Sequence, residues 1–305
     1  MAPQGRHRRG RGRNIDVPGE TVTDLPTFLY RYRSLTGYAR EDVERILAHG
    51  QIRFSSPAWF NDPFDCKLAP TFDATEDEKR CWLEDSYVPT VYPGLSNTDR
   101  AKAVEELMPE GNDLLRKHIE YTMQELIPNS GVISLSAVPD HILMWSHYAN
   151  GHRGICLKFR RFTLRFGQDF EEFEKQAPPP YQAEDGFSRR YEFEAQPVDY
   201  SDDVPKRRPL AELHNAWRAS VFTKSTHWRY EGEWRVLLPP GGNVPAYGWH
   251  QLPADSLAGL ILGCEISAED EKLVREWVRM GGVRLPFLRA EKKQGRFEVE
   301  IREIG

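Results

Sequence analysis

The amino-acid sequence predicts an α+β fold: one domain over residues 25–305, built on a mixed sheet and carrying a helical insertion. Segments typical of strands outnumber long helical patterns, and the two kinds interleave irregularly, which disfavours a repeating strand–helix–strand array. A mostly helical block at about residues 76–128 interrupts this pattern, so we expect it to be an insertion. No internal repeat is visible.

The first ordered segment predicts a strand, a helix and a second strand. "PTFLYRYRS" alternates around Phe28, Tyr30 and Tyr32, as strands do. "AREDVERILAHG" has apolar residues at helical spacing and Gly50 as its expected stop. "QIRFSSP" is a second strand that ends at Pro57, and "AWFNDPFDC" is a turn-rich loop.

Helices fill the expected insertion. "NTDRAKAVEELM" begins with a capping residue at Asn97 or Thr98, and "NDLLRKHIEYTMQELI" has an apolar face that includes Leu115 and Ile119. Pro128 is expected to end that helix. The apolar segment "GVISLSA" then predicts a short buried strand.

The remaining chain alternates between strands and helices. "DHILMWSHYANG" predicts a helix of about ten residues closed by Gly151, and "RGICLKF" predicts a strand. Residues 168–209 are polar and predict a mobile loop before the strand "QPVDYSD". The other expected elements are the helix "AELHNAWRASVFTKS", the strand "EGEWRVLL", the strand "LAGLILG", the helix "SAEDEKLVREWVRM" and the strands "VRLPFLRA" and "RFEVEIREI".

Composition and charge indicate a cytoplasmic, soluble protein with no membrane segment. Four cysteines lie far apart, without the spacing of a zinc site, and are expected to be reduced. The net charge is −5, although the first thirteen residues carry five arginines and no acid. Residues 1–24 therefore predict a basic, disordered arm, which either contacts nucleic acid or a membrane surface electrostatically or has no specific partner. The acidic remainder argues against a large nucleic-acid-binding face elsewhere.

The segment "FNDPFD" is the first candidate site. Asn61 and Asp62 before Pro63 predict a turn, and Phe60 and Phe64 would hold that turn against the body. The turn then either presents polar side chains to a pocket or is an ordinary surface turn.

The segment "MWSHYANGHRG" is the second candidate. Trp145 is expected in the core. His147 has a side chain that titrates near neutrality, so it is either a general acid or base or a packed histidine. Arg153, in the turn after the helix, could contact a phosphate.

The segment "YEGEWRVLL" is the third candidate. In a strand, Glu233 and Arg235 point to one face and Trp234 to the other. The tryptophan face predicts core. The charged face is either exposed to solvent or part of a polar pocket, and Lys224, Trp228 and Glu231 just upstream favour the pocket.

Five segments together resemble the bacterial domain-of-unknown-function family 2971 over about residues 29–263. They are "LYRYRS", "GQIRFSSPAWFNDPFDC", "ISLSA", "MWSHYANGHRGICLKF" and "TKSTHWRYEGEWRV". The name of that family supplies no activity.

A second resemblance suggests one. "LYRYRS", followed by a helix and "ILAHGQIRFSSP", is similar to the start of the ADP-ribosyltransferase fold. On this resemblance Arg31 stands at the position of the histidine or arginine that contacts NAD. Ser134 or Ser136 stands at the second-strand position, and Glu233 stands at the catalytic glutamate.

The resemblance implies NAD as substrate, no metal, and transfer of ADP-ribose to a protein or nucleic acid, or hydrolysis of NAD, in a bacterial toxin or phage-defence context. Such glycosidic cleavage builds positive charge on the ribose, which a carboxylate stabilises. Tyr32, Tyr148 or Trp59 would stack on nicotinamide. The sequence departs from the pattern because no Gly-Thr follows Arg31 and Arg33 adds a second cation.

Two other functions remain open. The chain could be a non-catalytic module that senses a nucleotide or protein ligand through the same cavity. A metal-dependent nuclease using Asp62, Asp65, Glu233 and His147 is the least favoured, because these residues lack compact carboxylate spacing.

Overall fold

The computed structural model describes residues 25–67, 74–160, 163–165, 192–204, 213–240, 246–253 and 255–304. The expected basic arm, residues 1–24, lies outside these ranges. So does the expected loop over 168–209, apart from residues 192–204.

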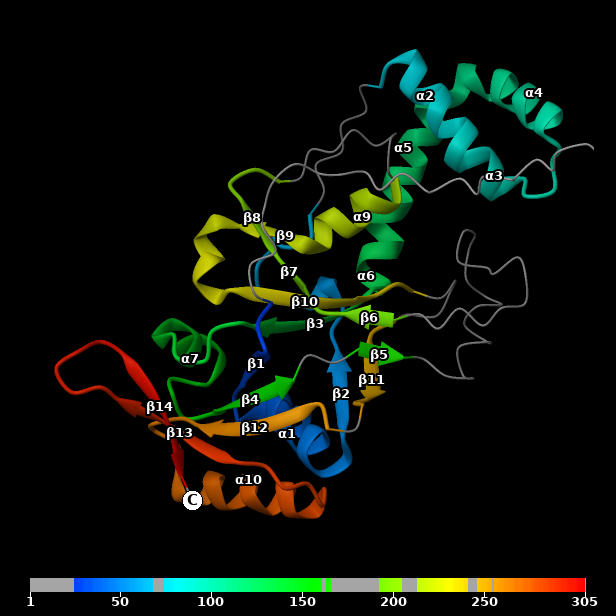
Figure 1. Ribbon diagram of the computed structural model, residues 1–305. Coiled ribbons are helices and arrows are strands. Elements are labelled where there is room, and N and C mark those ends of the chain that lie inside the picture. The colour runs from blue at the N-terminus through cyan, green and yellow to red at the C-terminus, as the bar shows by residue number, and fades with distance from the viewer. Residues whose placement is uncertain are drawn as a thin grey trace, which may run out of the picture.

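A mixed sheet of eight strands forms the centre of the described structure (Figure 1). Only β12 and β13 run parallel among its pairs; the rest are antiparallel. The strands lie in the order β14 (Val299–Ile304), β13 (Phe287–Lys292), β12 (Leu257–Leu262), β4 (Ile155–Arg160), β1 (Phe28–Arg33), β3 (Gly131–Ser136), β10 (Glu233–Leu238) and β7 (Gln196–Pro197). The predicted mixed sheet with helices is therefore confirmed.

Three helices cover the two faces of this sheet. α1 (Gly37–His49) and α10 (Ala268–Met280) pack on one face, where Leu29, Ile133 and Val236 point into the main core. α7 (Ile142–Tyr148) packs on the other face, against Tyr32 and Cys156. Alternate residues of each strand thus supply two separate apolar layers.

α7 is shorter than the ten residues expected. Its last turn runs into Asn150, Gly151 and His152, whose φ angles are 48°, 62° and 67°. Left-handed backbone cannot continue a right-handed helix, so the helix ends at Tyr148.

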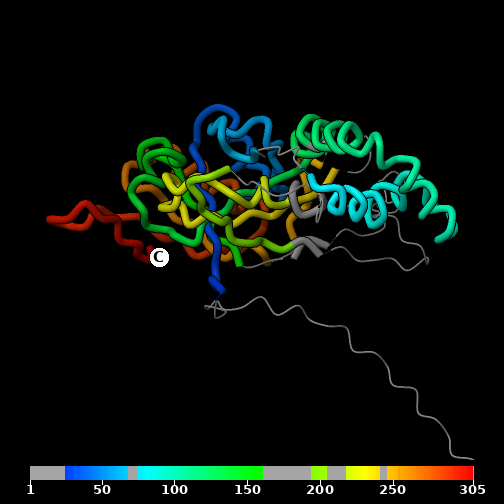
Figure 2. The backbone as a smooth tube through the Cα atoms, turned by 90° about the horizontal axis from the view of Figure 1, so that it is seen from above, coloured from blue at the N-terminus to red at the C-terminus, as the bar shows by residue number. Residues whose placement is uncertain are grey.

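The predicted helical block at 76–128 is observed as helices that extend away from the sheet (Figures 1 and 2). They have their own apolar core, which includes Trp82, Leu115 and Ile119. The block comprises α2 (Glu76–Trp82), a π-helical turn (Leu83–Tyr87), α3 (Val88–Val91), α4 (Asn97–Leu107), a 3₁₀ turn (Met108–Glu110), α5 (Gly111–Tyr121), a second π-helical turn (Thr122–Leu126) and α6 (Ile127–Asn129).

Two expectations within this block were wrong. The residue that caps α4 is Ser96, whose hydroxyl accepts from the Asp99 amide at 3.2 Å, and not Asn97 or Thr98. Pro128 lies inside α6, where its missing amide hydrogen is tolerated in a first turn, and the helical path continues to Asn129.

Short strands and turns complete the fold. β2 (Gln51–Phe54) pairs with β11 (Gly248–Gln251), a strand that the sequence pattern did not predict. The expected strand at 196–202 is divided between β7 and β8 (Asp199–Ser201). The remaining elements are α9 (Leu213–Phe222), β9 (Thr223–Ser225), β5 (Thr163–Arg165), β6 (Glu192–Glu194) and the 3₁₀ turns η1 (Pro57–Trp59) and η5 (Thr226–Glu231). None of the helices in the described ranges is long and apolar enough to cross a membrane.

Candidate functional site

The sheet forks beside β3, and the fork opens a cavity. β3 pairs with β10 along its whole length, but with β1 only where Tyr30 faces Ser136. At its other end Val132 pairs instead with Ser55, which follows β2. β1 and β2 therefore border the same edge of β3 at different heights, leaving unpaired backbone between them.

This cavity has a volume of about 290 Å³ and both charged and aromatic walls. Ligand pockets commonly occupy about 300–1,000 Å³, so this one would enclose only part of a dinucleotide. Its lining comprises Tyr30, Arg31, Tyr32, Arg33, Ser55, Trp59, Phe60, Asn61, Asp65, Val132, Ser134, Leu135, Ser136, Met144, Tyr148, Lys224, Glu231, Glu233 and Arg235. We call it the fork pocket.

Glu233 and Arg235 lie on the pocket face of β10, while Trp234 packs against the main core. Arg235 donates to Glu233 through Nε at 2.7 Å and Nη2 at 2.9 Å. Lys224 adds a third bond to Glu233, at 2.9 Å. Burial alone would raise the pKa of Glu233, but Arg235 and Lys224 outweigh it and hold that pKa at about 2. Glu233 is therefore an anion at neutral pH.

Asp65 completes the pairing of Arg235. Its Oδ1 accepts from Nη1 at 2.9 Å and its Oδ2 accepts from Nη2 at 2.6 Å. The Arg235 side chain is 0% exposed, so these two carboxylates are its counter-charges in place of water, and its Nη1 also donates to the Val221 carbonyl. The network ties β10 to the loop that contains Asp65.

Glu231 has the opposite electrostatic environment to Glu233. It accepts from the Tyr148 hydroxyl at 2.6 Å and from Lys224 at 2.5 Å. Burial raises its pKa, and Lys224 only partly offsets the rise. The pocket thus holds two carboxylates whose pKa values are shifted in opposite directions, the arrangement that separates roles in acid–base chemistry.

Arg31 brings a charge into the pocket that the described residues leave unsatisfied. Its side chain is 5% exposed, and its one hydrogen bond runs from Nη2 to the Arg53 carbonyl at 3.4 Å. Nε and Nη1 are buried and have no hydrogen-bond partner in the described part of the chain. Burial lowers its pKa, Arg33 lowers it further, and Asp42 opposes both. Buried groups of this kind are rare in proteins and call for a ligand or another explanation.

The "FNDPFD" loop contributes one of its two expected residues to the pocket, Asn61, and not the other, Asp62. Asn61, Phe60 and Asp65 line the fork pocket. Asp62 does not: its carboxylate accepts from the Phe64 amide at 2.9 Å and from the Trp228 indole at 2.6 Å. Asp62 therefore anchors the loop.

Both candidate serines, Ser134 and Ser136, line the pocket, but they differ in their burial. Ser136 is buried, and its hydroxyl bonds to the Glu231 carbonyl at 2.6 Å, which fixes the turn before β10 to the end of β3.

Two predicted residues of the second segment lie outside the pocket lining. His147 is exposed on α7, whose Met144 and Tyr148 face the pocket instead. Arg153 is exposed in the turn between α7 and β4. The other predicted site residues, Arg31, Tyr32, Trp59, Asn61, Ser134, Ser136, Tyr148, Lys224, Glu233 and Arg235, all line the pocket.

The sequence pattern indicated Glu231 only as a neighbour that favours a pocket, and it gave Asp65 only a place in the nuclease alternative. The signal for Glu231 was its position two residues before Glu233 across Gly232, which adopts a left-handed conformation (φ 49°). That turn swings Glu231 back toward the same cavity. The pairing of Asp65 and Arg235 joins residues 170 positions apart, so no local pattern could reveal it.

The nuclease alternative loses support from this geometry. Asp62 and His147 lie outside the pocket lining, and Asp65 and Glu233 are engaged with cations. Within the described ranges, no group of three histidine, cysteine, aspartate or glutamate side chains is placed to hold a metal ion.

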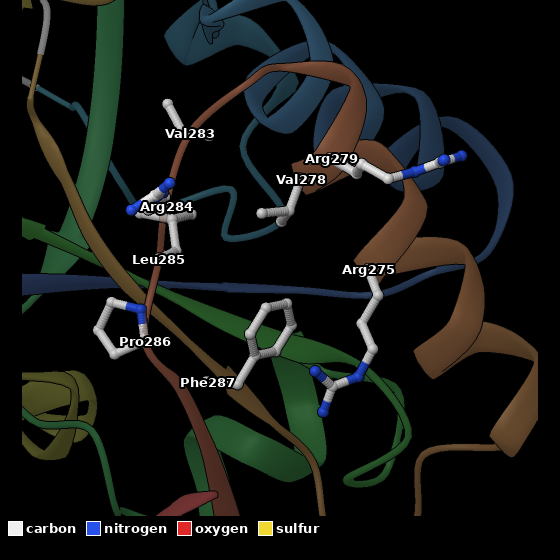
Figure 3. A pocket seen from close by; sticks show the side chains of 8 residues that line it. All are labelled: Arg275, Val278, Arg279, Val283, Arg284, Leu285, Pro286 and Phe287. Atoms are coloured by element: carbon white, nitrogen blue, oxygen red, sulfur yellow. The ribbon is translucent and has the colours of Figure 1, made fainter. Parts of the chain in front are cut away.

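A second depression lies at the end of α10 (Figure 3). Arg275 lies over the Phe287 ring at 4.2 Å and pairs with Glu271 at 2.9 Å. This surface lacks the buried carboxylates of the fork pocket. It is lined by Arg275, Val278, Arg279, Val283, Arg284, Leu285, Pro286 and Phe287.

Comparison with known proteins gives one match. No curated protein and no solved structure matches the chain. The resemblance to the ADP-ribosyltransferase fold is not confirmed by any of these comparisons. One family matches residues 144–236. This segment runs from α7 to β10 and contains six residues of the fork pocket: Met144, Tyr148, Lys224, Glu231, Glu233 and Arg235. The family is described as "Protein of unknown function (DUF2971)", and the match confirms the first resemblance over that shorter range.

Proposed function

We propose that the fork pocket binds NAD, cleaves its nicotinamide–ribose bond and transfers ADP-ribose to a macromolecule or to water. The observation that carries this proposal is one cavity whose lining holds an ionised carboxylate, Glu233, an unsatisfied guanidinium, Arg31, and aromatic rings. β1, β3 and β10, the strands that contain Arg31, Ser134 and Glu233, are neighbours in the sheet, and this adjacency supports the proposal.

Cleavage would need charge stabilisation and no acid. The C1′–N bond breaks, its electron pair goes to the ring nitrogen, and nicotinamide leaves neutral. Positive charge then develops on the ribose, next to a carboxylate that stays ionised because its pKa is about 2. Glu233 would take that role.

The acceptor must lose a proton as its oxygen bonds to C1′. Glu231 would receive it, because a carboxylate with a raised pKa is the stronger base of the two. The Tyr148 hydroxyl, which donates to Glu231 at 2.6 Å, would orient that carboxylate.

Arg31 would bind an anionic oxygen of the dinucleotide. Its two buried, unpartnered nitrogens, Nε and Nη1, face different edges of the guanidinium, so each can donate to a separate phosphate or ribose oxygen. Trp59, which is 56% exposed at the pocket, would stack on an aromatic base.

The test is release of free nicotinamide from labelled NAD by the full-length protein. Wild type should produce nicotinamide, and Glu233→Gln and Arg31→Gln should each lower the rate by about a hundredfold or more. Glu300→Gln, at an exposed ion pair on β14, is the matched control and should keep the wild-type rate. Absence of nicotinamide from wild type would rule out the enzyme reading.

One observation favours a second candidate, a non-catalytic nucleotide-sensing module. Both oxygens of Glu233 already accept from Arg235 or Lys224, so part of its charge is offset before any ligand arrives. Such a module would show an increase in melting temperature with NAD, lost in Arg31→Gln, without nicotinamide production.

A further inference from the structure

A row of arginines and aromatic rings runs across the surface next to the fork pocket. Arg45 lies over the Trp249 ring at 4.7 Å, and Arg53 lies over both Trp249, at 5.9 Å, and Trp59, at 5.6 Å. Trp59 in turn meets Tyr247 edge-on at 4.8 Å. We call these five residues the arginine–aromatic strip.

The strip is built on the paired strands β2 and β11. Arg53 on β2 faces Trp249 on β11 directly across the strand pair, so the two side chains share one face. Ile52 and Phe54 point the other way, into the main core. Figure 1 shows β2 and β11 side by side at one edge of the body.

The two arginines of the strip differ in their acidic partners. Arg45 pairs with Glu41 at 3.1 Å, whereas no carboxylate in the described ranges pairs with Arg53. Arg33 has a buried Nε with no partner there, and its single ion pair, to Asp42, is long at 3.8 Å. Arg31 and Arg33 line the fork pocket, so arginines with few acidic partners occur both in the pocket and in the strip beside it.

We propose that the strip binds a single-stranded nucleic acid. Such ligands need two features together: cations that follow the phosphates and exposed rings on which unpaired bases stack. The strip alternates both, and Trp59 belongs to it and to the pocket lining, so a strand bound there would end at the pocket opening. Duplexes offer phosphates but hide their base faces, and acidic peptides offer charge but few flat rings.

The strip extends the proposed function by naming the acceptor. A nucleotide held at Trp59 would present a base or ribose oxygen to the bound dinucleotide. This acceptor role rests on the proposed NAD chemistry, whereas binding of the strand does not.

The experiment measures fluorescence anisotropy of labelled oligonucleotides of about 12 residues, a length within the range of single-strand sites. RNA and DNA of the same sequence, the corresponding DNA duplex and a glutamate-rich peptide are compared at about 50 and 200 mM salt. The full chain is used throughout, so any contribution of the basic arm is common to all proteins.

The test variants are Arg53→Gln and Trp249→Thr, neither of which lines the pocket. The matched controls are Arg296→Gln and Phe297→Ala, an arginine and a 96% exposed ring at the tip of the β13–β14 hairpin, on the other side of the body (Figures 1 and 2). Melting temperature is recorded for each, since Trp249→Thr changes a half-buried position.

We expect wild type to bind single strands more tightly than the duplex or the peptide. Each test variant should weaken binding by about 5- to 100-fold, and Arg53→Gln should reduce the salt slope by about 0.7. Preference for RNA over DNA would indicate contact with the 2′-hydroxyl.

Two results would overturn the inference: single strands binding no better than the duplex or the peptide, or control variants weakening binding as much as strip variants. Nicotinamide release without oligonucleotide is measured in parallel. If wild type binds single strands but releases no nicotinamide, the strip stands and the proposed enzyme function fails. If wild type releases nicotinamide but binds no single strand, the proposed enzyme function stands and the strip proposal fails.

Discussion

Glu233 and Arg235, two residues apart on β10, form a bidentate ion pair inside the fork pocket, with nitrogen–oxygen distances of 2.7 and 2.9 Å. The period of a strand places both on one face, and the sheet removes both from solvent. Because Arg235 also pairs with Asp65, the same charges that would act on a ligand hold the loop at residues 60–66 to the sheet. Function and stability are therefore coupled at this pair.

Replacement of Glu233 by Gln should lower stability as well as activity. The strand pattern alone suggests that stability would be nearly intact, but the amide leaves Lys224 and Arg235 with less buried counter-charge. Removing one partner of a buried ion pair costs about 3–5 kcal/mol. Urea unfolding would measure this loss. An unfolding free energy equal to that of Glu300→Gln would contradict it.

The stability difference between wild type and Glu233→Gln should depend on pH. The pKa of Glu233 falls from 4.5 to about 2 on folding, so the folded state binds fewer protons between these values. The contribution of Glu233 is thus present in full above about pH 4.5 and is lost as the pH falls toward 2. Urea titrations across this window should show the gap between the two proteins closing. A gap that stays constant would show that Glu233 is not a salt-bridged anion.

Local periodicity was enough to predict most of the sheet and its helices. β1 and β10 were predictable because successive side chains of a strand point to opposite faces, and each face has its own kind of residue. The end of α1 was predictable because Gly50 adopts a left-handed conformation, with a φ of 63°. β11 was missed because a four-residue strand beginning at Gly248 has no apolar alternation. It exists because β2 offers it a pairing edge, which is tertiary information.

The site was predictable in part. The alternation around Trp234 left the charged face either in solvent or in a polar pocket, and the structure buries Glu233 and Arg235 in a pocket. The sequence could not say which carboxylate of the "FNDPFD" turn points inward. The turn over 63–66 ends at Cys66, whose φ is 54°, and aims Asp65 at Arg235 while Asp62 bonds to Trp228.

Substitution of Gly281 by Ala should disrupt the contact between α1 and α10. An added Cβ would lie 2.0 Å from the Leu47 carbonyl oxygen, so the two helices would have to separate. The φ of Gly281 is −71°, which alanine adopts freely, so the cost is steric alone. Overpacking of this kind costs about 1–3 kcal/mol.

Thermal unfolding would measure the effect of that substitution. Gly94→Ala is the matched control, because an added Cβ there meets nothing within 4 Å. Equal melting temperatures for the two variants would mean that α10 can move without loss of packing.

Arg31→Met should make the protein more stable and unable to bind NAD. Arg31 is buried at 5% exposure, with Nε and Nη1 unpartnered in the described structure, so the free protein carries an uncompensated desolvation cost. Methionine fills a similar volume without a charge, and replacing buried ionic groups by apolar ones can stabilise by about 1–4 kcal/mol. Arg296→Met, at a position 65% exposed, should change stability by less than about 0.5 kcal/mol. Urea unfolding and NAD titration of both variants would separate these effects. A binding site keeps such a buried charge because the bound ligand offsets its desolvation. If Arg31→Met were destabilised and still bound NAD, Arg31 would instead serve the packing of β1 against β2.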